Sequence, residues 1–530
     1  MPAEPTGSDR GIGRQYLHTF AFALARVVSH ALLIIILGRT MTLEEYGAYA
    51  LIATAIPVGV TVVGLDLYAY LAREIPGLPQ DRGIAVFKGA FRFQVLSSVL
   101  LVGLVLATGL DSLLVGHTEL ANYRNLVRMG LLVFPFAYLQ RELARYFIAV
   151  KRIEVSNLSQ FLCTNSWAYA ILLLILMHRR LTLPIVFAAW IAGGAASVLY
   201  GIGEVSRMGF FRQRAARGVV AKGLRFSLPL LAGTIGFQIN DVSGRYVISH
   251  FRPLAEAGGY SFLQTLVTTG GVLTYTIVEA ILRPRIVEAD NLNNSRRRDV
   301  LTNRLLRYSW VLLLPVMLVL LISGPELLAL ISQPGYARYL NLVPYFATTA
   351  LVMASAVPFS VVLFLQRRTG LMGAINLASS VANIGISILL VPRLGAAGAS
   401  FAGLLAFSGV LAANYLFARR TGPIVSISDA RLLPLTASGL AMAAVMLAAR
   451  AVWLDVGSPA GPAIGLLFAG GVGSVAFGAA AWITGAIEPG EKAYVRRLLA
   501  GAVGRVPAAA APAASSDTEE DVYGDTDLEP

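Results

Sequence analysis

Charged residues are scarce in this chain of 530 residues: Asp, Glu, Lys and Arg make up 14% of it, whereas apolar residues make up 56%. A soluble protein of this length needs far more charged surface to remain in solution. Together with a mean hydropathy of +0.67, the composition excludes an ordinary soluble protein and indicates a membrane protein.

Cysteine and histidine are also rare, because the chain has one cysteine, Cys163, and five histidines without ligand spacing. No disulfide or cysteine metal cluster can form within one chain. The sequence has no Walker loop, no Gly-rich dinucleotide turn after a strand, and no clustered nucleophile and base. We therefore predict a protein without catalytic residues, metal or cofactor, driven by an ion gradient, the membrane potential or a substrate gradient.

Apolar runs of about 20 residues recur along nearly the whole chain, and each is long enough to cross a bilayer core of roughly 30 Å. Lipid offers no hydrogen-bond partners, so these runs must be helices. We predict fourteen spans, at approximately 16–38, 46–70, 90–110, 126–149, 158–177, 182–203, 224–248, 259–282, 308–332, 342–365, 372–392, 396–418, 433–453 and 462–486. The first run is too long for a cleavable signal peptide and is interpreted as a retained span.

The net charge of +13 does not require nucleic acid as a partner. Lys and Arg collect in the cytoplasmic loops of membrane proteins. The N-terminus and the loops after even-numbered spans hold about 32 of the 43 Lys and Arg residues, and the opposite loops hold about 10. This asymmetry predicts that both termini lie in the cytoplasm, and it favours contact of the basic loops with anionic membrane lipids.

Two copies of a short motif follow the first and the seventh predicted spans. Residues 45–49 read Glu-Tyr-Gly-Ala-Tyr and residues 256–260 read Glu-Ala-Gly-Gly-Tyr, so Glu, Gly and Tyr match at one constant offset. A third echo, Ala-Ala-Gly-Ala-Ser at 396–400, precedes the twelfth span. A small residue at the start of a helix allows a tight turn and close helix packing. The repeat therefore predicts two pseudosymmetric lobes of six helices each.

The predicted organisation is an all-α polytopic membrane protein with an N-terminal lobe at 1–215 and a C-terminal lobe at 216–420. Two accessory spans occupy 421–503. The tail at 504–530 is rich in Ala and Pro and then acidic, and we expect it to be disordered because it has little apolar surface to bury. Six-span repeats are frequent in transporters, with the substrate path between the halves.

Three segments carry a resemblance to a known family. The segment 37–50, with Leu-Gly-Arg at 37–39 and Glu-Glu-Tyr-Gly-Ala-Tyr-Ala at 44–50, resembles the first hairpin of Wzx-type polysaccharide flippases, which belong to the multidrug/oligosaccharidyl-lipid/polysaccharide exporter superfamily. Gly-Leu-Arg-Phe-Ser-Leu-Pro-Leu at 223–230 is similar to that family's seventh span, and the segment 376–399 to its eleventh and twelfth. The resemblance covers roughly residues 10–420. It implies two pseudosymmetric bundles, a central cavity and alternating access.

Arg26 is the clearest charge in the middle of a predicted span. A charge at mid-helix costs about 2.5–3.5 kcal/mol on insertion scales, so it normally faces a cavity or a partner. Arg26 has Ser29 beside it and His30 one turn further on the same face. We interpret this face as a cationic cavity site for a diphosphate, to which Arg can make paired hydrogen bonds. The alternative is a structural pair with a carboxylate or with carbonyl groups.

Two i, i+4 pairs of opposite charge lie in the seventh and eighth spans. Asp241 and Arg245 form either an ion pair that locks the lobes or a cavity site, and the repeat offset places Asp241 opposite His30. Glu279 and Arg283 form either a gate or coupling site or an interfacial pair.

The fourth span carries Arg141 and Arg145 on one face, towards the predicted cytoplasmic side, where Asp66, Gln140 and Glu142 also lie. These arginines either receive the incoming phosphates or extend to the membrane interface, and the interfacial alternative is slightly favoured. Aromatic residues that could stack on sugars, but that more often form interfacial belts, are Tyr68, Tyr70, Trp167, Tyr169 and Trp190.

These observations favour a flippase that moves an isoprenoid-(di)phosphate-linked oligosaccharide from the cytoplasmic to the outer leaflet of a bacterial plasma (inner) membrane, for surface polysaccharide biosynthesis. The expected partners are this lipid-linked oligosaccharide, membrane lipids, and a polysaccharide polymerase or glycosyltransferases. One alternative is a cation-coupled multidrug exporter, which predicts an acidic cavity. Another is a membrane-embedded polymerase or glycosyltransferase, against which the short outer loops argue.

Overall fold

The computed structural model describes residues 8–493 and 496, apart from 77, 110–111, 113–118, 178–179, 421–424, 427 and 455–460. Within these residues the regular structure is entirely helical, with no strand. Nine of the described helices are long and apolar enough to cross a membrane, or up to eleven if each of two bent pairs is one span. The protein is thus a multi-pass membrane protein. The tail at 504–530 lies outside the described residues.

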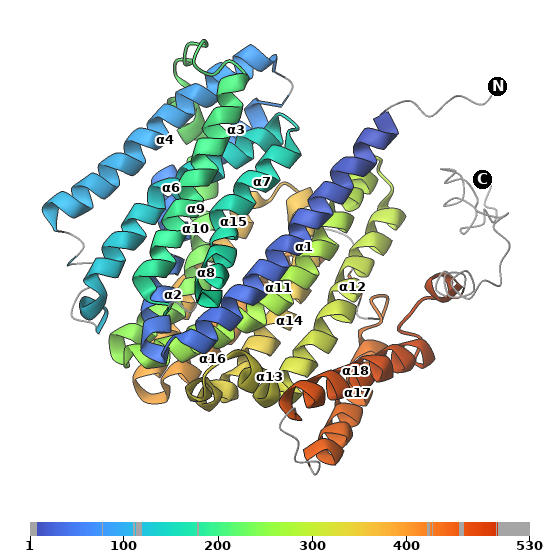
Figure 1. Ribbon diagram of the computed structural model, residues 1–530. Coiled ribbons are helices and arrows are strands. Elements are labelled where there is room, and N and C mark those ends of the chain that lie inside the picture. The colour runs from blue at the N-terminus through green and yellow to red at the C-terminus, as the bar shows by residue number, and fades with distance from the viewer. Residues whose placement is uncertain are drawn as a thin grey trace, which may run out of the picture.

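The first half of the chain forms one helical lobe, shown in blue to green in Figure 1. Its elements are α1 (Ser8–Thr40), α2 (Leu43–Gly64), α3 (Leu67–Glu74), α4 (Gln80–Thr108), η1 (Glu119–Tyr123), α6 (Arg124–Ala149), α7 (Ile153–Thr164), α8 (Ser166–Leu176) and α9 (Leu183–Arg207). Within this N-lobe, α6 packs against α2, α4, α7 and α9.

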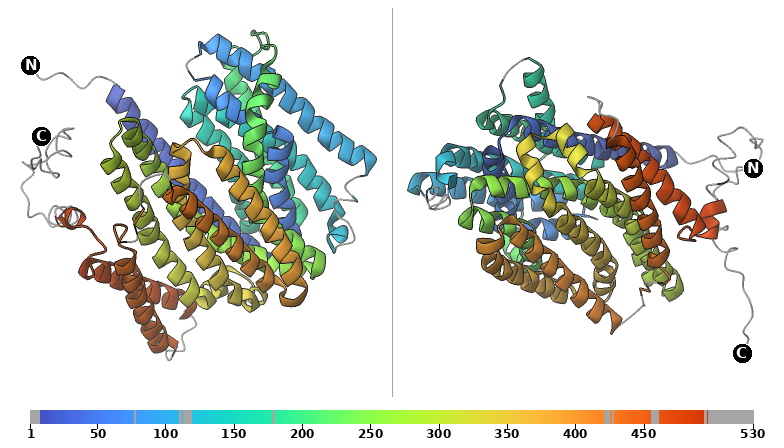
Figure 2. Two further views of the ribbon diagram at one scale, coloured as in Figure 1. Left: turned by 180° about the vertical axis from the view of Figure 1, so that it is seen from behind. Right: turned by 90° about the horizontal axis from the view of Figure 1, so that it is seen from below.

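The second half forms the C-lobe and two further helices. The C-lobe contains α10 (Val219–Phe251), α11 (Leu254–Asn291), α12 (Ser295–Ile322), α13 (Gly324–Ile331), η2 (Pro334–Leu342), α14 (Val343–Leu365), α15 (Thr369–Leu394) and α16 (Ala396–Arg419). The last two helices, α17 (Leu432–Leu454) and α18 (Gly461–Ile483), lie at the outer edge of the C-lobe, away from the N-lobe (Figures 1 and 2). They pack on α12 and α13, so they are attached to one lobe only.

Three predicted spans are broken or bent helices. The second divides into α2 and α3 at Leu65 and Asp66, which both adopt left-handed backbone conformations with φ of 48° and 54°. The fifth bends by 43° between α7 and α8, and α10 bends by 59° beyond Leu228, where the next residue in the sequence is a proline. The helices α1, α6 and α11 are of similar length but are not among the nine most apolar. The count of fourteen spans therefore stays a prediction.

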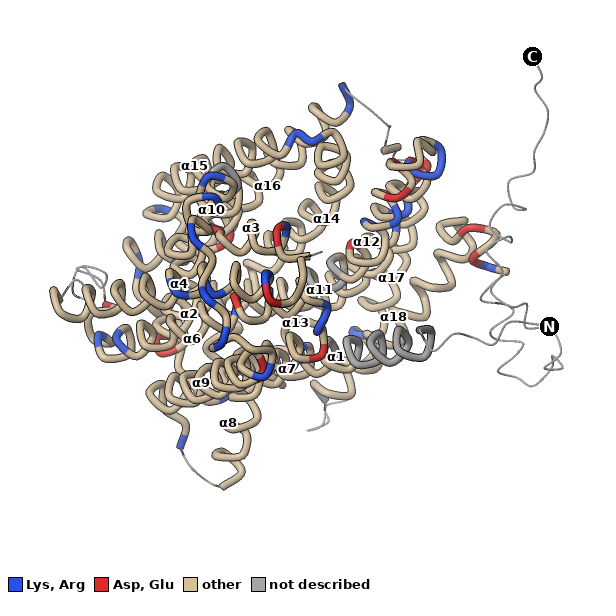
Figure 3. The backbone as a smooth tube through the Cα atoms, turned by 90° about the horizontal axis from the view of Figure 1, so that it is seen from above, with Lys and Arg blue, Asp and Glu red and all other residues tan. Residues whose placement is uncertain are grey.

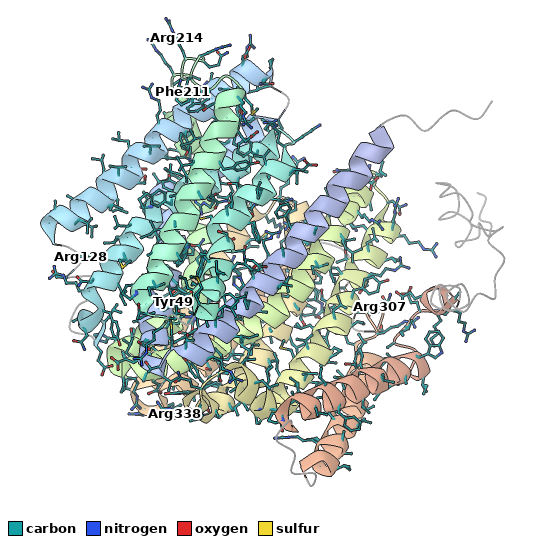
Figure 4. The ribbon with its side chains drawn as sticks, in the orientation of Figure 1. Tyr49, Arg128, Phe211, Arg214, Arg307 and Arg338 are labelled. Atoms are coloured by element: carbon teal, nitrogen blue, oxygen red, sulfur yellow. The ribbon has the colours of Figure 1, made fainter. Side chains whose placement is uncertain are left out.

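The helices end on two opposite sides of the molecule (Figure 1). The side on which α1 begins is called the terminal side, and its outermost part is the α9–α10 loop with Phe211 and Arg214 (Figure 4). The side of the α1–α2 turn is called the hairpin side. Here Thr42 caps α2: its hydroxyl accepts from Glu45 N at 3.3 Å, and its own N–H donates to the Glu45 carboxylate at 2.9 Å. This capping box explains why α2 begins at the first copy of the motif.

Candidate functional site

The two motif copies meet face to face at the hairpin side. A Cβ atom added at Gly47 would lie 2.4 Å from Leu254 O, and one added at Gly258 would lie 1.8 Å from Leu43 O. Leu43 stands in the same relation to Gly47 as Leu254 does to Gly258, so the two contacts are equivalent. The start of α2 and the start of α11 therefore cross with their backbones in direct contact, about the pseudosymmetry axis that the repeat predicts. Only glycine permits this approach.

Other hydrogen bonds between the lobes surround this crossing. Gln333 N donates to Gly38 O at 2.9 Å, and the Tyr336 hydroxyl donates to Met41 O at 3.2 Å. The Glu119 carboxylate accepts from Leu254 N at 2.7 Å, which joins the N-lobe to the first turn of α11. We call this set of contacts, with the Gly47–Gly258 crossing, the hairpin-side seal. It closes the space between the lobes on this side.

The second and third copies of the motif are joined by the carboxylate of Glu256. Glu256 Oε1 accepts from Ala396 N at 2.6 Å, at the start of α16. The preceding residue, Gly395, has φ of 58° and ψ of −140°, and a Cβ there would lie 2.1 Å from Glu256 Oε1. The acidic residue of the motif thus accepts a hydrogen bond from a backbone N–H at the N-terminus of α16, which has no partner within that helix. This role was not predicted from the sequence.

Arg26 is half-buried on α1. Its Nη1 donates to Gln160 Oε1 of α7 at 3.4 Å, and no carboxylate of the described residues lies within 4.0 Å of it. Ser29 is buried and lies 3.0 Å from the hydroxyl of Tyr169, whereas His30 is exposed. The structural pair with a carboxylate that we considered as an alternative is absent among the described residues. The contacts of α1 across the lobe boundary are with α11 and α13, and none joins His30 to Asp241 within the described chain.

Asp241 and Arg245 are linked through a third residue. Arg245 is buried, and its Nε donates to Gln264 Oε1 at 3.1 Å. The amide nitrogen of Gln264 donates to Asp241 O at 3.1 Å and lies 3.4 Å from Asp241 Oδ1. Arg245 also interacts electrostatically with tyrosines of both lobes, Tyr46, Tyr49 and Tyr260. The cation therefore lies next to the hairpin-side seal.

The predicted pair in α11 forms directly. Arg283 Nη1 lies 2.8 Å from Glu279 Oε1, and the guanidinium lies over the ring of Phe364, 4.8 Å from its centroid. Both charged side chains are partly exposed, at 39% and 24%.

The two arginines of α6 converge on one aromatic ring. Arg141 and Arg145 lie 5.3 Å and 5.0 Å from the centroid of Tyr68. Arg141 also donates to Val60 O at 3.1 Å and to Thr61 Oγ at 3.2 Å, whereas Arg145 is exposed. The Tyr68 ring thus makes cation–π contacts with both guanidinium groups. Trp167 and Trp190 stack on each other at 5.4 Å inside the N-lobe, and Tyr70 packs against Phe226 of α10.

A polar seam joins α2 and α10, which belong to different lobes. The hydroxyl of Ser227 donates to Leu65 O at 2.7 Å, and that of Thr234 donates to Asp66 Oδ2 at 3.1 Å. The amide of Gln238 donates to the hydroxyl of Thr61 at 2.9 Å. Residues 227, 234 and 238 recur on one helix face, so polar periodicity in the seventh span would have revealed this seam. The sequence analysis did not search for it.

The C-lobe contains a half-open pocket of about 190 Å³ between α10, α11, α14, α15 and α16. Its polar lining is formed by Tyr275, Ser360, Asn376 and Asn414, and its apolar lining includes Phe237 and Met353. Seen from the terminal side, basic segments also gather around the middle of the molecule (Figure 3). No group of three or more His, Cys, Asp or Glu side chains suited to a metal ion occurs in the described part of the chain.

Comparison with known proteins bears on the fold and the family. Residues 18–290, just over half of the chain, match the family described as polysaccharide biosynthesis protein. The structure titled "Lipid II flippase MurJ, inward closed conformation" has a TM-score of 0.62 at 15% identity, covering 88% of this chain and 97% of that one. The structure of MATE in complex with MaL6 has a TM-score of 0.51 at 12% identity, covering 75% and 93%. No curated protein matches the chain. At such low identity these structures establish a shared fold.

Proposed function

Because the chain belongs to the polysaccharide biosynthesis protein family, we propose that it is a flippase for an isoprenoid-(di)phosphate-linked oligosaccharide. It moves this lipid from the cytoplasmic to the outer leaflet of the bacterial inner membrane by alternating access, as a transporter rather than an enzyme. The fold shared with a lipid II flippase supports the transport of a large lipid-linked saccharide.

The observation that carries this proposal is the environment of Arg26. Among the described residues, the half-buried guanidinium of Arg26 has one hydrogen-bond partner, the neutral amide of Gln160 at 3.4 Å, and no anion there offsets its desolvation. A diphosphate supplies such an anion and matches the planar fork of the guanidinium. Arg141 and Arg145, held over Tyr68, extend the positive potential towards the terminal side.

The distribution of charge supports a direction of transport. We place the terminal side in the cytoplasm because the loops on that side carry most Lys and Arg residues. The hairpin-side seal then closes the outer face, so the substrate's phosphates enter from the cytoplasm and meet Arg141 and Arg145 before Arg26. An inside-negative membrane potential favours outward movement of an anion by about 2.3 kcal/mol per charge per 100 mV.

The test uses a strain that depends on this chain for its surface polysaccharide. We expect Arg26→Ala and Arg26→Gln to abolish surface polysaccharide and to trap the lipid-linked oligosaccharide in the cytoplasmic leaflet, at normal protein level. Arg180→Ala is the control, because Arg180 is exposed between α8 and α9. Normal polysaccharide in both Arg26 variants would contradict the proposed role of Arg26. Altered drug susceptibility with unchanged polysaccharide would instead favour the multidrug exporter.

A further inference from the structure

Buried polar atoms without a hydrogen-bond partner are concentrated in one part of the N-lobe. Fourteen such side-chain atoms occur among the described residues, and eight of them belong to α4, α6 and the α2–α3 turn. Buried polar groups in native proteins are normally hydrogen-bonded, and each exception needs an explanation. A cluster of such unpaired polar atoms indicates that a small ligand or an ion binds between these helices. The residue types in the cluster indicate which one.

Glu142 of α6 is the most deeply buried acid of this cluster, with 1% of the residue exposed. Its Oε2 has no partner, and its Oε1 lies 3.7 Å from Arg141 Nε. That distance is well beyond the ~2.7–2.9 Å of a charge-assisted hydrogen bond. Arg141 directs its other nitrogens to Val60 O and Thr61 Oγ on α2. Gln94 of α4 lies against the carboxyl group and interacts with it weakly, in a geometry that falls short of a full hydrogen bond.

Asp66 places a second carboxyl group at this cluster, because it lies two residues beyond Gly64, where an added Cβ would lie 3.3 Å from Arg141 Nη2. Asp66 is 2% exposed and its Oδ1 has no partner. It is held in a left-handed backbone conformation, as is Leu65 before it, a strain of the kind that persists only where the surrounding structure imposes it. Two buried carboxylates close together cannot both remain ionised without a strong counter-charge. Arg145 is the other nearby cation, and it is exposed.

We propose that Asp66 and Glu142 form a proton-binding site, with the proton on Glu142 when the lobes are packed as in this structure. A proton removes the charge of the buried carboxylate and turns Oε2 into a donor for the unpartnered oxygens around it. A metal ion fits less well, because two acids are fewer than such a site normally supplies, and the described chain offers no group of three metal-ligating side chains.

The site is connected directly to the lobe boundary by the side chain of Asp66. Asp66 Oδ2 accepts a hydrogen bond from Thr234 of α10 at 3.1 Å, in the polar seam between α2 and α10. Rocking of the lobes changes this contact and hence the environment of the acid pair, so the binding of the proton and the state of the seam are linked. Use of this linkage to drive transport rests on the proposed flippase function, whereas the binding of the proton does not.

Infrared spectroscopy of the purified full-length protein tests the site itself. At neutral pH we expect the carbonyl-stretch band of a protonated carboxylic acid, which is lost in Glu142→Gln and retained in Glu154→Gln, an exposed acid of the neighbouring α7. Absence of this band in the wild-type protein, or its persistence in Glu142→Gln, would overturn the proposal. The wild-type result decides the matter even if Glu142→Gln does not fold.

Thiol labelling tests the link to the seam. Tyr70 of α3 contacts Phe226 of α10, with ring centroids 6.3 Å apart, so a cysteine in Tyr70→Cys reports on the seam. Because a polar maleimide reacts with the thiolate, we expect labelling of this cysteine to rise with pH more steeply than that of a free thiol, and to follow the free thiol's pH dependence in the Glu142→Gln background. The same pH dependence in both backgrounds would refute the linkage. A protein that retains the infrared band but moves no saccharide would refute the flippase function and leave the proton site standing.

Discussion

Individual residues determine the sign of the potential between the lobes. Within the described part of the chain, Arg26 has Gln160 Oε1 as its one hydrogen-bond partner, and Arg245 is bound by Gln264 Oε1, another neutral amide. Arg141 donates to a carbonyl and to a hydroxyl and also lies 3.7 Å from the Glu142 carboxyl group, so its charge is offset unless Glu142 is protonated. Where neutral acceptors hold a guanidinium, its positive charge is left uncompensated and is available to an anion. This arrangement suits a phosphate-bearing lipid better than a cationic drug.

Arg26→Lys separates charge from geometry at this position. Lysine keeps the positive charge but loses the planar fork that binds two phosphate oxygens. We expect transport to fall about tenfold relative to wild type, which corresponds to about 1.4 kcal/mol or one charge-assisted hydrogen bond. The rate at which labelled lipid-linked oligosaccharide reaches the outer leaflet measures this. Full activity in Arg26→Lys would mean that charge alone is sufficient.

Gly395 is the position at which a side chain is least tolerated for reasons of backbone conformation. Gly395→Ala combines a positive φ with a Cβ placed 2.1 Å from Glu256 Oε1, and we expect a loss of stability of about 1–3 kcal/mol. Gly403→Ala in α16 is the control, because no atom lies within 4 Å of its added Cβ. Thermal unfolding in detergent distinguishes the two, and equal stability of both variants would contradict the assigned strain.

The sequence predicted several charged residues of the site but not their partners. The i, i+4 rule found Glu279 and Arg283 because both lie on one helix, and the structure confirms their contact. It also placed Asp241 and Arg245 on one face, but the amide of Gln264 that joins them comes from another helix. Contacts between helices depend on packing that local periodicity does not encode. The roles of all these residues in transport stay predictions.

At the scale of helices, the repeat motif identified two equivalent helix starts, and the structure explains why they match. Gly47 and Gly258 face each other because each removes the side chain that would keep α2 and α11 apart. From the sequence, these glycines are expected to allow a tight turn and close helix packing. The sequence does not predict that the two copies touch, because a match along the chain does not say which surfaces meet.

Gly258→Ala should open the hairpin-side seal. Its Cβ would lie 1.8 Å from the backbone oxygen of Leu43, so the helices must separate, and overpacking of this kind costs about 1–3 kcal/mol. We expect a cysteine in Tyr336→Cys, at a position that is fully buried in the seal, to become accessible to a membrane-impermeant thiol reagent in the Gly258→Ala background. Gly103→Ala, where the added Cβ contacts nothing within 4 Å, should leave it protected. Protection in both backgrounds would argue against the seal.

The segment that follows α18 is attached to α12 by an ion-pair network. Arg307 of α12, labelled in Figure 4, is 1% exposed and contacts Glu488 and Glu491. Burial alone would raise the pKa of Glu488, but the hydrogen bond and charge of Arg307, with the charge of Arg304, hold that pKa below its usual value. Because the folded-state pKa is lowered, the contribution of Glu488 is complete above the ordinary carboxyl pKa. It is lost as the pH falls through the lowered value.

This network predicts a local opening at acidic pH. We expect the protection of residues around Glu488 against hydrogen exchange, relative to the intrinsic rate at each pH, to fall only below the usual carboxyl titration range, while the rest of the C-lobe remains protected. Glu488→Gln combined with Glu491→Gln should produce the same opening at neutral pH, because Arg307 is then buried without a counter-charge at a cost of about 3 kcal/mol. Uniform protection across the whole pH range would show that the network does not hold the segment.

At the scale of the whole molecule, two helical lobes meet along two different contacts. The hairpin-side seal joins them through backbone atoms at glycines, whereas the α2–α10 seam joins them through hydroxyl and amide side chains. Polar side chains can exchange hydrogen-bond partners as the lobes move. Two helices whose backbones are in direct contact can only move apart. We therefore expect the seam to adjust, and the seal to open as a unit, when the lobes rock. The fold class and the repeat could be predicted from hydropathy and from the motif, because both are local.

Transport by the purified protein tests the account most directly. The protein is reconstituted into liposomes that contain a fluorescent isoprenoid-diphosphate-linked oligosaccharide, and the fraction of saccharide accessible to an added lectin is followed over time. The account predicts that the wild-type protein exposes saccharide from both leaflets. Liposomes with Arg26→Ala should expose only the leaflet that is accessible at the start. Equal exposure by wild-type protein, Arg26→Ala and protein-free liposomes would contradict the central claim that this protein is a lipid-linked oligosaccharide flippase.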